Sequence, residues 1–167
     1  MVLAGLWLLL YPVVCQHWND TRQRQSVSAW KVSGGDTDLL GYLYIPRLSL
    51  TLPVGQGTSD AVLSSGTGLL EGSSFDTHAV LCGHSGLPEA KLFTGLEQLQ
   101  PGDCFTVTQR SDNRSYEVVE VLVVKPEETQ YLQPEEDKDL CTLLTCTPYG
   151  INSHRLLVRG EFRSNCP

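Results

Sequence analysis

From residue 41 onward, the chain is dominated by short apolar segments that alternate with polar positions and are separated by turn-forming residues. This pattern is typical of β-strands, and the Gly, Pro, Asp and Asn residues between the segments predict turns. Seven or so such strands in one chain predict an all-β fold, either a sandwich or a closed barrel. We expect strands within residues 41–54, 78–82, 104–109, 116–124, 140–146 and 154–162.

Three connecting segments have a different character. Residues 87–99 carry Leu92, Phe93, Leu96 and Leu99 at helical spacing, which predicts a short helix. Residues 126–139 contain six acidic residues and one lysine, which predicts a solvated loop between two strands. Residues 57–74 are rich in Gly and Ser and predict turns with one short helix or strand.

Length and charge narrow the class of protein. The 167 residues are one domain's worth of sequence, and with 41% hydrophobic residues they can bury a core. A net charge of -7 argues against a nucleic-acid-binding module, which normally presents a basic face to phosphates. We therefore expect no nucleic-acid partner.

The amino-terminal residues resemble part of a membrane segment. Residues 1–15 read MVLAGLWLLLYPVVC, and no charged residue precedes Asp20. Fifteen helical residues cover roughly 22 Å, less than a hydrocarbon core of about 30 Å. We expect residues 1–17 to be a partial membrane anchor and residues 18–40 an amino-terminal helix and short linker. The alternative is an ordinary apolar helix packed on the domain.

The six cysteines show no recognisable pairing or metal-binding pattern, because no C-x-x-C spacing occurs. Cys15 and Cys166 lie near the two ends and are expected to stay outside any core. Cys141 precedes Cys146 by five residues, so strand alternation places their side chains on opposite faces. Cys82 shares a strand face with His84; we expect it to pack, the alternative being a second thiol that oxidises against Cys146.

One group of residues has the elements of nucleophilic catalysis. Cys146 ends an apolar strand before a turn, a position that holds a side chain rigidly at the rim of a sheet. Arg155 begins the next strand and is suited to lowering a thiol pKa or binding an oxyanion. His84 follows another strand, in the turn Gly83–Gly86, and is suited to proton transfer. His78 and His154 are read as structural.

Around these residues the sequence resembles the sortases, and most of all the class C, pilin-polymerising sortases. The resemblance runs from about Trp18 to Phe162. It is carried by TLLTCTPYGINSHRLLVRG (Thr142–Gly160) and HAVLCGHSGLPEAKLFTGLEQLQPGD (His78–Asp103), and also by GYLYIPRLSLTLPV and GTGLLEGSS.

The resemblance implies a closed, eight-stranded sortase β-barrel with short helices over residues 41–167. It implies a cysteine transpeptidase that cleaves an LPXTG-like sorting motif between Thr and Gly, with Cys146 as nucleophile, His84 as acid and base, and Arg155 as stabiliser of the oxyanion. The acyl group would pass to an amine, a pilin lysine in pilus assembly. The alternatives are a cell-wall anchoring sortase that uses a peptidoglycan precursor amine, and a simple cysteine peptidase.

The resemblance also implies partners and a location. The partners are a pilin or surface protein bearing the sorting motif, an amine acceptor, and the membrane through the amino-terminal segment; no metal or organic cofactor is expected. The location is the extracytoplasmic face of the cell membrane of a Gram-positive bacterium. Class C enzymes usually carry a lid with an Asp-Pro-aromatic motif, and no Asp-Pro dipeptide occurs here. We therefore expect a variant without this lid.

Overall fold

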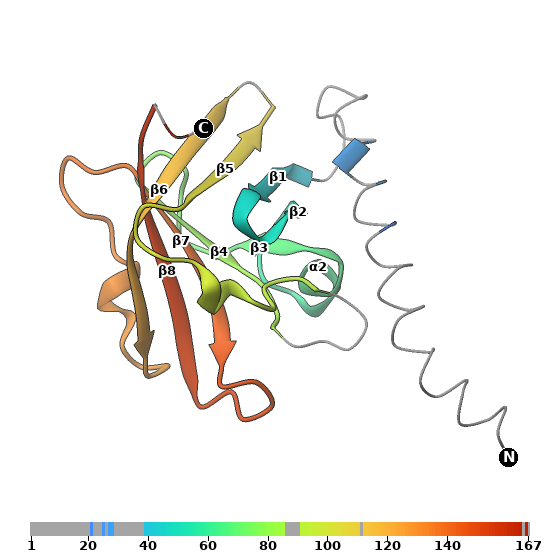
Figure 1. Cartoon of the computed structure of the whole chain (residues 1–167), viewed down its shortest axis with the longest axis vertical. Helices are drawn as coiled ribbons and strands as arrows, with labels where there is room; N and C mark the ends of the chain where they lie inside the picture. The colour runs from blue at the N-terminus through green and yellow to red at the C-terminus, as the bar shows by residue number, and fades with distance from the viewer. Residues whose placement is uncertain are drawn as a thin grey trace, which may run out of the picture.

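Eight strands form a closed barrel in the computed structural model (Figure 1). The structure describes residues 39–85, 91–110, 112–164 and 166, together with Thr21, Gln25, Val27 and Ser28. The strands are β1 (Leu39–Ile45), β2 (Leu50–Gln56), β3 (Thr67–Leu69), β4 (His78–Cys82), β5 (Cys104–Gln109), β6 (Asn113–Val124), β7 (Leu140–Thr147) and β8 (His154–Phe162). The short helices are η1 (Pro46–Leu48), α2 (Asp60–Ser65), η2 (Leu96–Gln98) and η3 (Thr129–Leu132).

The barrel has the strand order β1-β2-β3-β4-β7-β8-β6-β5, and β5 pairs with β1 to close it. The β2–β3 and β4–β7 pairs are parallel, and the other pairs are antiparallel. The prediction of an all-β, closed eight-stranded barrel with short helices is confirmed. The parallel β4–β7 pair matters for function, because it brings the carboxyl ends of two strands to the same end of the barrel.

Alternation along β7 separates its side chains into two sets. Cys141 and Leu143 belong to the core cluster inside the barrel, together with Leu156 and Val158 of β8. Cys146, one position out of phase with this set, is only half-buried. Cys141 is fully buried and its thiol pKa is raised, because burial disfavours the thiolate. The predicted separation of the two cysteines onto opposite faces agrees with this placement.

The helix predicted over residues 87–99 is wrong for the residues that are described. Residues 92–95 form turns, and only Leu96–Gln98 are helical, as a single 3-10 turn. Gly95 (φ 89°) and Leu92 (φ 33°) adopt left-handed backbone conformations, which a continuous right-handed helix excludes. The side chains of these four apolar positions are nevertheless buried: Leu92, Phe93, Leu96 and Leu99. The spacing therefore indicated correctly which residues enter the core, but not the backbone conformation.

Two cysteines that were given no role form a disulfide. Cys104, at the start of β5, is bonded to Cys166, and their Cα atoms lie 5.9 Å apart. The residues are 62 positions apart in the sequence, and the pairing of β6 with both β5 and β8 brings them together. The sequence analysis found no pairing pattern among the cysteines and did not predict this bond.

The amino-terminal predictions lie largely outside the described residues. This applies to the partial anchor over residues 1–17 and to most of the linker over residues 18–40, including the expected absence of a lid. Within the part of the chain that the structure describes, no helix has the length and apolar character needed to cross a membrane.

Candidate active site

Cys146 and Arg155 lie directly opposite each other where β7 ends and β8 begins. In the antiparallel β7–β8 ladder Cys146 is the register partner of Arg155, and Thr147 is the partner of His154. Both side chains are half-buried. The Arg155 guanidinium donates hydrogen bonds from Nη1 to the carbonyl oxygens of Asn152 (3.1 Å) and His154 (3.0 Å). The turn between the strands thus holds the guanidinium near the end of the sheet.

His84 comes from the neighbouring strand on the other side of β7. Cys82 of β4 is the register partner of Leu144, and the Gly83 N–H continues this pairing by donating to the Leu144 carbonyl (3.1 Å). The next residue is His84, and its half-buried side chain therefore belongs to the same barrel end as Cys146. Three adjacent strands, β4, β7 and β8, thus bring together the three residues singled out by the sequence.

Two side-chain hydrogen bonds fix the backbone on either side of His84. The Thr145 hydroxyl donates to the carbonyl of Gly83 (2.7 Å), and the Ser85 hydroxyl donates to the carbonyl of Cys146 (2.7 Å). Residues 83–85, which we call the histidine turn, are therefore joined to the predicted nucleophile Cys146 and to Thr145 beside it. Sequence reasoning missed both hydroxyl groups; the only signal was that Ser85 stands in the glycine-flanked turn after β4.

Packing also restricts the histidine turn. A Cβ atom at Gly83 would lie 2.7 Å from the ring of Phe93, which is too close for any residue other than glycine. The Phe93 N–H donates to the carbonyl of His84 (3.0 Å), which ties the following segment back to the turn. The contact between Gly83 and Phe93 therefore helps to hold His84 in place.

Cys82 lies beside the site but is poorly placed for a disulfide with Cys146. Its partner Leu144 is two residues before Cys146, so strand geometry separates the two cysteine Cα atoms by roughly 8 Å, beyond the usual disulfide range. Burial raises the pKa of the Cys82 thiol to about 11; nearby Cys146 adds to the rise and Arg155 opposes it. Cys82, Cys141 and Cys146 are all free thiols, and we favour the packing role for Cys82.

Two cavities meet the Cys146–Arg155 pair from different sides. One, of about 290 Å³, contains Cys146 and lies at the mouth of the barrel; it is lined by Ser85, Thr94, Gly95, Glu97, Thr145, Cys146, Thr147, Pro148, Tyr149 and Leu156. The other, of about 80 Å³, contains Arg155 and lies under the β6–β7 connection; it is lined by Val124, Lys125, Pro126, Glu128, Thr129, Leu132, Leu144, Arg155 and Leu157.

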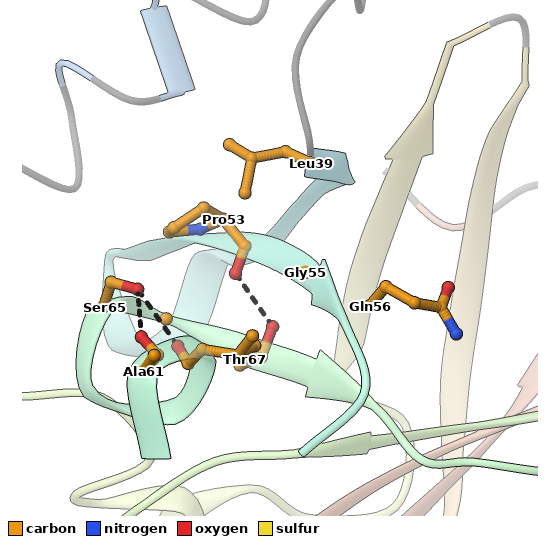
Figure 2. Close-up of a pocket in the computed structure, with 9 residues that line it drawn as sticks. Leu39, Pro53, Gly55, Gln56, Ala61, Ser65 and Thr67 are labelled. Atoms are coloured by element: carbon orange, nitrogen blue, oxygen red, sulfur yellow. Dashed lines mark hydrogen bonds between the residues drawn. The ribbon is translucent and has the colours of Figure 1, made fainter. Parts of the chain in front are cut away.

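A third cavity, of about 360 Å³, lies away from these residues, beside α2 and β2 (Figure 2). Its described lining is mostly apolar and contains no acid, base or nucleophile comparable to Cys146. Thr67, the first residue of β3, donates a hydrogen bond to the Pro53 carbonyl of β2 there (3.1 Å) and thus joins the two strands at the cavity. This cavity has no residues for the chemistry considered above.

The acidic β6–β7 connection is more firmly attached to the barrel than predicted. Glu135 pairs with both Arg159 and Lys138, and these contacts lower the pKa of its carboxyl to about 2, the Lys138 contact contributing most. The Gln133 carbonyl accepts a hydrogen bond from Nδ1 of buried His78 (3.0 Å). The loop is largely exposed, as expected, but strands β4 and β8 also supply partners that the local sequence does not reveal.

His78 has a structural environment, as the sequence analysis expected. Its Nε2 lies 2.8 Å from the Thr142 hydroxyl, and only 1% of the residue is exposed. Because a carbonyl only accepts, Nδ1 carries the proton toward Gln133 and Nε2 is left to accept from Thr142. Among the described residues, no group of three His, Cys, Asp or Glu side chains is arranged to hold a metal ion.

Comparison with known proteins gives the family. Residues 43–163 match a family model described as "Sortase domain". Among curated proteins, the chain is 28% identical over 125 residues to Sortase A of Bacillus anthracis, covering 74% of this chain and 59% of that protein. It is 26% identical over 149 residues to Sortase D of Bacillus subtilis, covering 86% of this chain and 72% of that protein. The chain thus spans less than two thirds of the length of the first of these relatives.

Solved structures give higher identities. Sortase C-1 of Streptococcus pneumoniae is 44% identical with a TM-score of 0.73, over 75% of this chain and 67% of that one. Sortase C-1 of Actinomyces oris is 44% identical with a TM-score of 0.74, over 77% and 74%. A protein described as the pilus-related Sortase C of Group B Streptococcus is 37% identical with a TM-score of 0.75, over 77% and 69%.

Proposed function

Because the chain belongs to the sortase family, we propose that it is a cysteine transpeptidase that cleaves an LPXTG-like sorting motif between Thr and Gly. One observation carries the proposal: β4, β7 and β8 bring His84, Cys146 and Arg155 to one end of the barrel, with Cys146 and Arg155 in register. These are a nucleophile, a proton-transfer group and a cation that can stabilise negative charge, which are the components of covalent acyl transfer.

In the first half of the proposed reaction, the Cys146 thiolate attacks the carbonyl carbon of the motif's Thr. The C–S bond forms while the carbonyl electron pair moves to oxygen, and Arg155 stabilises the resulting oxyanion. When the tetrahedral intermediate collapses, the C–N bond to Gly breaks and His84 protonates the departing amine. The product is a thioester on Cys146.

In the second half, an amine attacks the thioester. The C–N bond forms, the C–S bond breaks, and His84 accepts a proton from the incoming amine while Cys146 is released. We propose a pilin lysine as this amine, which the class C structural neighbours support, one of them described as pilus-related. A peptidoglycan precursor amine would instead make this an anchoring sortase, and water alone would make it a cysteine peptidase.

We also propose that the enzyme lies on the extracytoplasmic face of a Gram-positive cell membrane, held by the segment over residues 1–17. The Cys104–Cys166 disulfide supports an extracytoplasmic location, because disulfides persist in oxidising compartments and are rare in the cytosol. Protease treatment of intact cells tests the location: the barrel should become accessible without lysis, and protection until lysis would contradict it.

The activity is tested with a sorting-motif peptide in the presence and absence of an added amine. The wild-type protein should release the Gly-containing fragment and should convert the rest to an amide when amine is present. Cys146→Ala should abolish both products, whereas Cys141→Ala, on the same strand but facing the core, should retain them. Product formation by Cys146→Ala would refute the nucleophile, and acid product alone at saturating amine would identify a peptidase.

The acceptor is tested separately with a purified pilin that carries the sorting motif. Replacement of the accepting lysine by arginine should prevent covalent pilin oligomers while cleavage of the motif continues. Oligomers that persist without any pilin lysine would exclude the proposed acceptor. Transfer to a peptidoglycan precursor amine in preference to pilin would favour the anchoring alternative.

A further inference from the structure

Two cavities that differ in chemistry lie at the Cys146–Arg155 pair, one lined by Cys146 and the other by Arg155. Arg155 and Leu144 line the cavity under the β6–β7 connection, while Thr145 and Leu156 line the one at the barrel mouth. These two sets alternate along β7 and β8, so they belong to opposite faces of the sheet. Cys146 is the residue of the predicted site that lines the mouth cavity, and its register partner Arg155 lines the other.

A transpeptidase needs room for two substrates at its nucleophile, and the position of Arg155 assigns them. The thioester oxygen must point toward Arg155 if the guanidinium is to stabilise the oxyanion. The acyl donor then occupies the side on which Arg155 lies. The mouth cavity, which Cys146 lines and Arg155 does not, is left for the second substrate.

The mouth cavity suits an alkyl amine. Pro148, Tyr149 and Leu156 provide apolar surface for the alkyl chain. Among the described residues that line this cavity, Glu97 is the only charged one, and it forms no ion pair within the described part of the chain. Its carboxylate is exposed and can exchange water for an ammonium group.

We propose that the mouth cavity is the acceptor site and that Glu97 binds the ammonium group of the incoming amine. This inference rests on the proposed transpeptidase function and adds a residue that determines acceptor specificity. The ammonium binds at Glu97, gives one proton to neutral His84, and attacks the thioester as a free amine. The second amine proton passes to the departing Cys146 sulfur as the C–S bond breaks. Loss of that proton to solvent restores the Cys146 thiolate beside a protonated His84, the state that begins the next cycle.

The test is the ratio of amide to acid product formed from one thioester, because this ratio does not depend on how fast the thioester forms. With a lysine-like amine at subsaturating concentration, Glu97→Gln should lower the amide-to-acid ratio about tenfold, and Glu97→Lys should lower it further through repulsion. The control is Glu71→Gln, an exposed acid on the turn between β3 and β4, which should keep the wild-type ratio.

Hydroxylamine provides a second control, because it is largely uncharged at neutral pH and has no alkyl chain. Its partition ratio should change much less in Glu97→Gln than that of the lysine-like amine. An unchanged ratio for the lysine-like amine in both Glu97 variants would overturn the acceptor site, and so would equal losses for the two amines. A wild-type protein that forms no thioester would instead overturn the proposed function itself.

Discussion

The two ends of the β7–β8 pair are built differently. At one end, which we call the closed end, Asp139 accepts hydrogen bonds from Arg114 (3.1 Å) and Tyr116 (3.3 Å). There the Cys104–Cys166 disulfide joins the start of β5 to the residues that follow β8. At the other, which we call the open end, Cys146 and Arg155 face cavities.

This difference shows how one barrel combines rigidity with reactivity. The closed end helps to fix the register of β5, β6, β7 and β8 with a covalent bond and the ion pair between Arg114 and Asp139. Because register propagates along a ladder, the position of Cys146 opposite Arg155 is determined far from the site itself. The residues at the open end are then left to contact substrate, and loss of a side chain there should affect chemistry more than stability.

The largest expected effect separates two arginines at opposite ends of β8. Arg155→Ala should lower the rate of sorting-peptide cleavage about 10³-fold, because the oxyanion loses its cationic partner. Arg163→Ala, just beyond the other end of the strand, removes exposed ion pairs with Glu161 and Glu117 and a hydrogen bond to the Phe162 carbonyl (3.2 Å). It should leave the rate within about twofold of wild type. Steady-state kinetics measures the cleavage rate of both variants, with circular dichroism as a check of folding. Equal losses of rate in the two variants would show that the two ends of the strand do not differ in their role.

The second expected effect lies at the closed end. Replacing Cys104 and Cys166 together by alanine should lower the free energy of unfolding by about 2–4 kcal/mol, since the disulfide closes a long loop in the unfolded chain. Urea denaturation measures the loss. The cleavage rate per folded molecule should stay near that of wild type; a large fall in this rate under native conditions would show that the open end depends directly on the disulfide.

The sequence predicted the strands well because their patterns are local. β4, β7 and β8 each read as an apolar run ending at a turn, and these three strands position His84, Cys146 and Arg155. The features that were missed depend on distant partners. The segment around Leu92 is buried by the barrel without being helical, Cys104 meets a cysteine 62 residues away, and Glu135 finds Arg159 on another strand.

A smaller effect is expected for the hydroxyl that joins the histidine turn to β7. Ser85→Ala removes the donor to the Cys146 carbonyl (2.7 Å), a hydrogen bond worth about 1 kcal/mol, and should lower kcat about fivefold by loosening the position of His84. Ser85→Thr keeps a hydroxyl and should recover most of the rate. A fall in stability with unchanged kcat would make Ser85 structural and not a positioning residue.

The smallest expected effect concerns His78, on the outer face of β4 away from the site. Burial, aided by the charge of Arg159, lowers its pKa below 6.5, while the Gln133 carbonyl and Glu135 oppose this shift. The folded state therefore binds fewer protons than the unfolded state below pH 6.5. The stability contributed by neutral His78 is complete above that pH and is lost as the pH falls through the lowered value.

His78→Gln should accordingly flatten the decline of unfolding free energy between pH 6.5 and more acidic conditions, as measured by urea denaturation at a series of pH values. The pH profile of peptide cleavage should keep its wild-type shape, because His78 bonds to Thr142 and the β6–β7 connection and does not line the cavity at Cys146. An altered pH profile of activity with an unaltered pH profile of stability would mean that this histidine acts at the open end. The assignment of a structural role to His78 and a catalytic role to His84 would then be wrong.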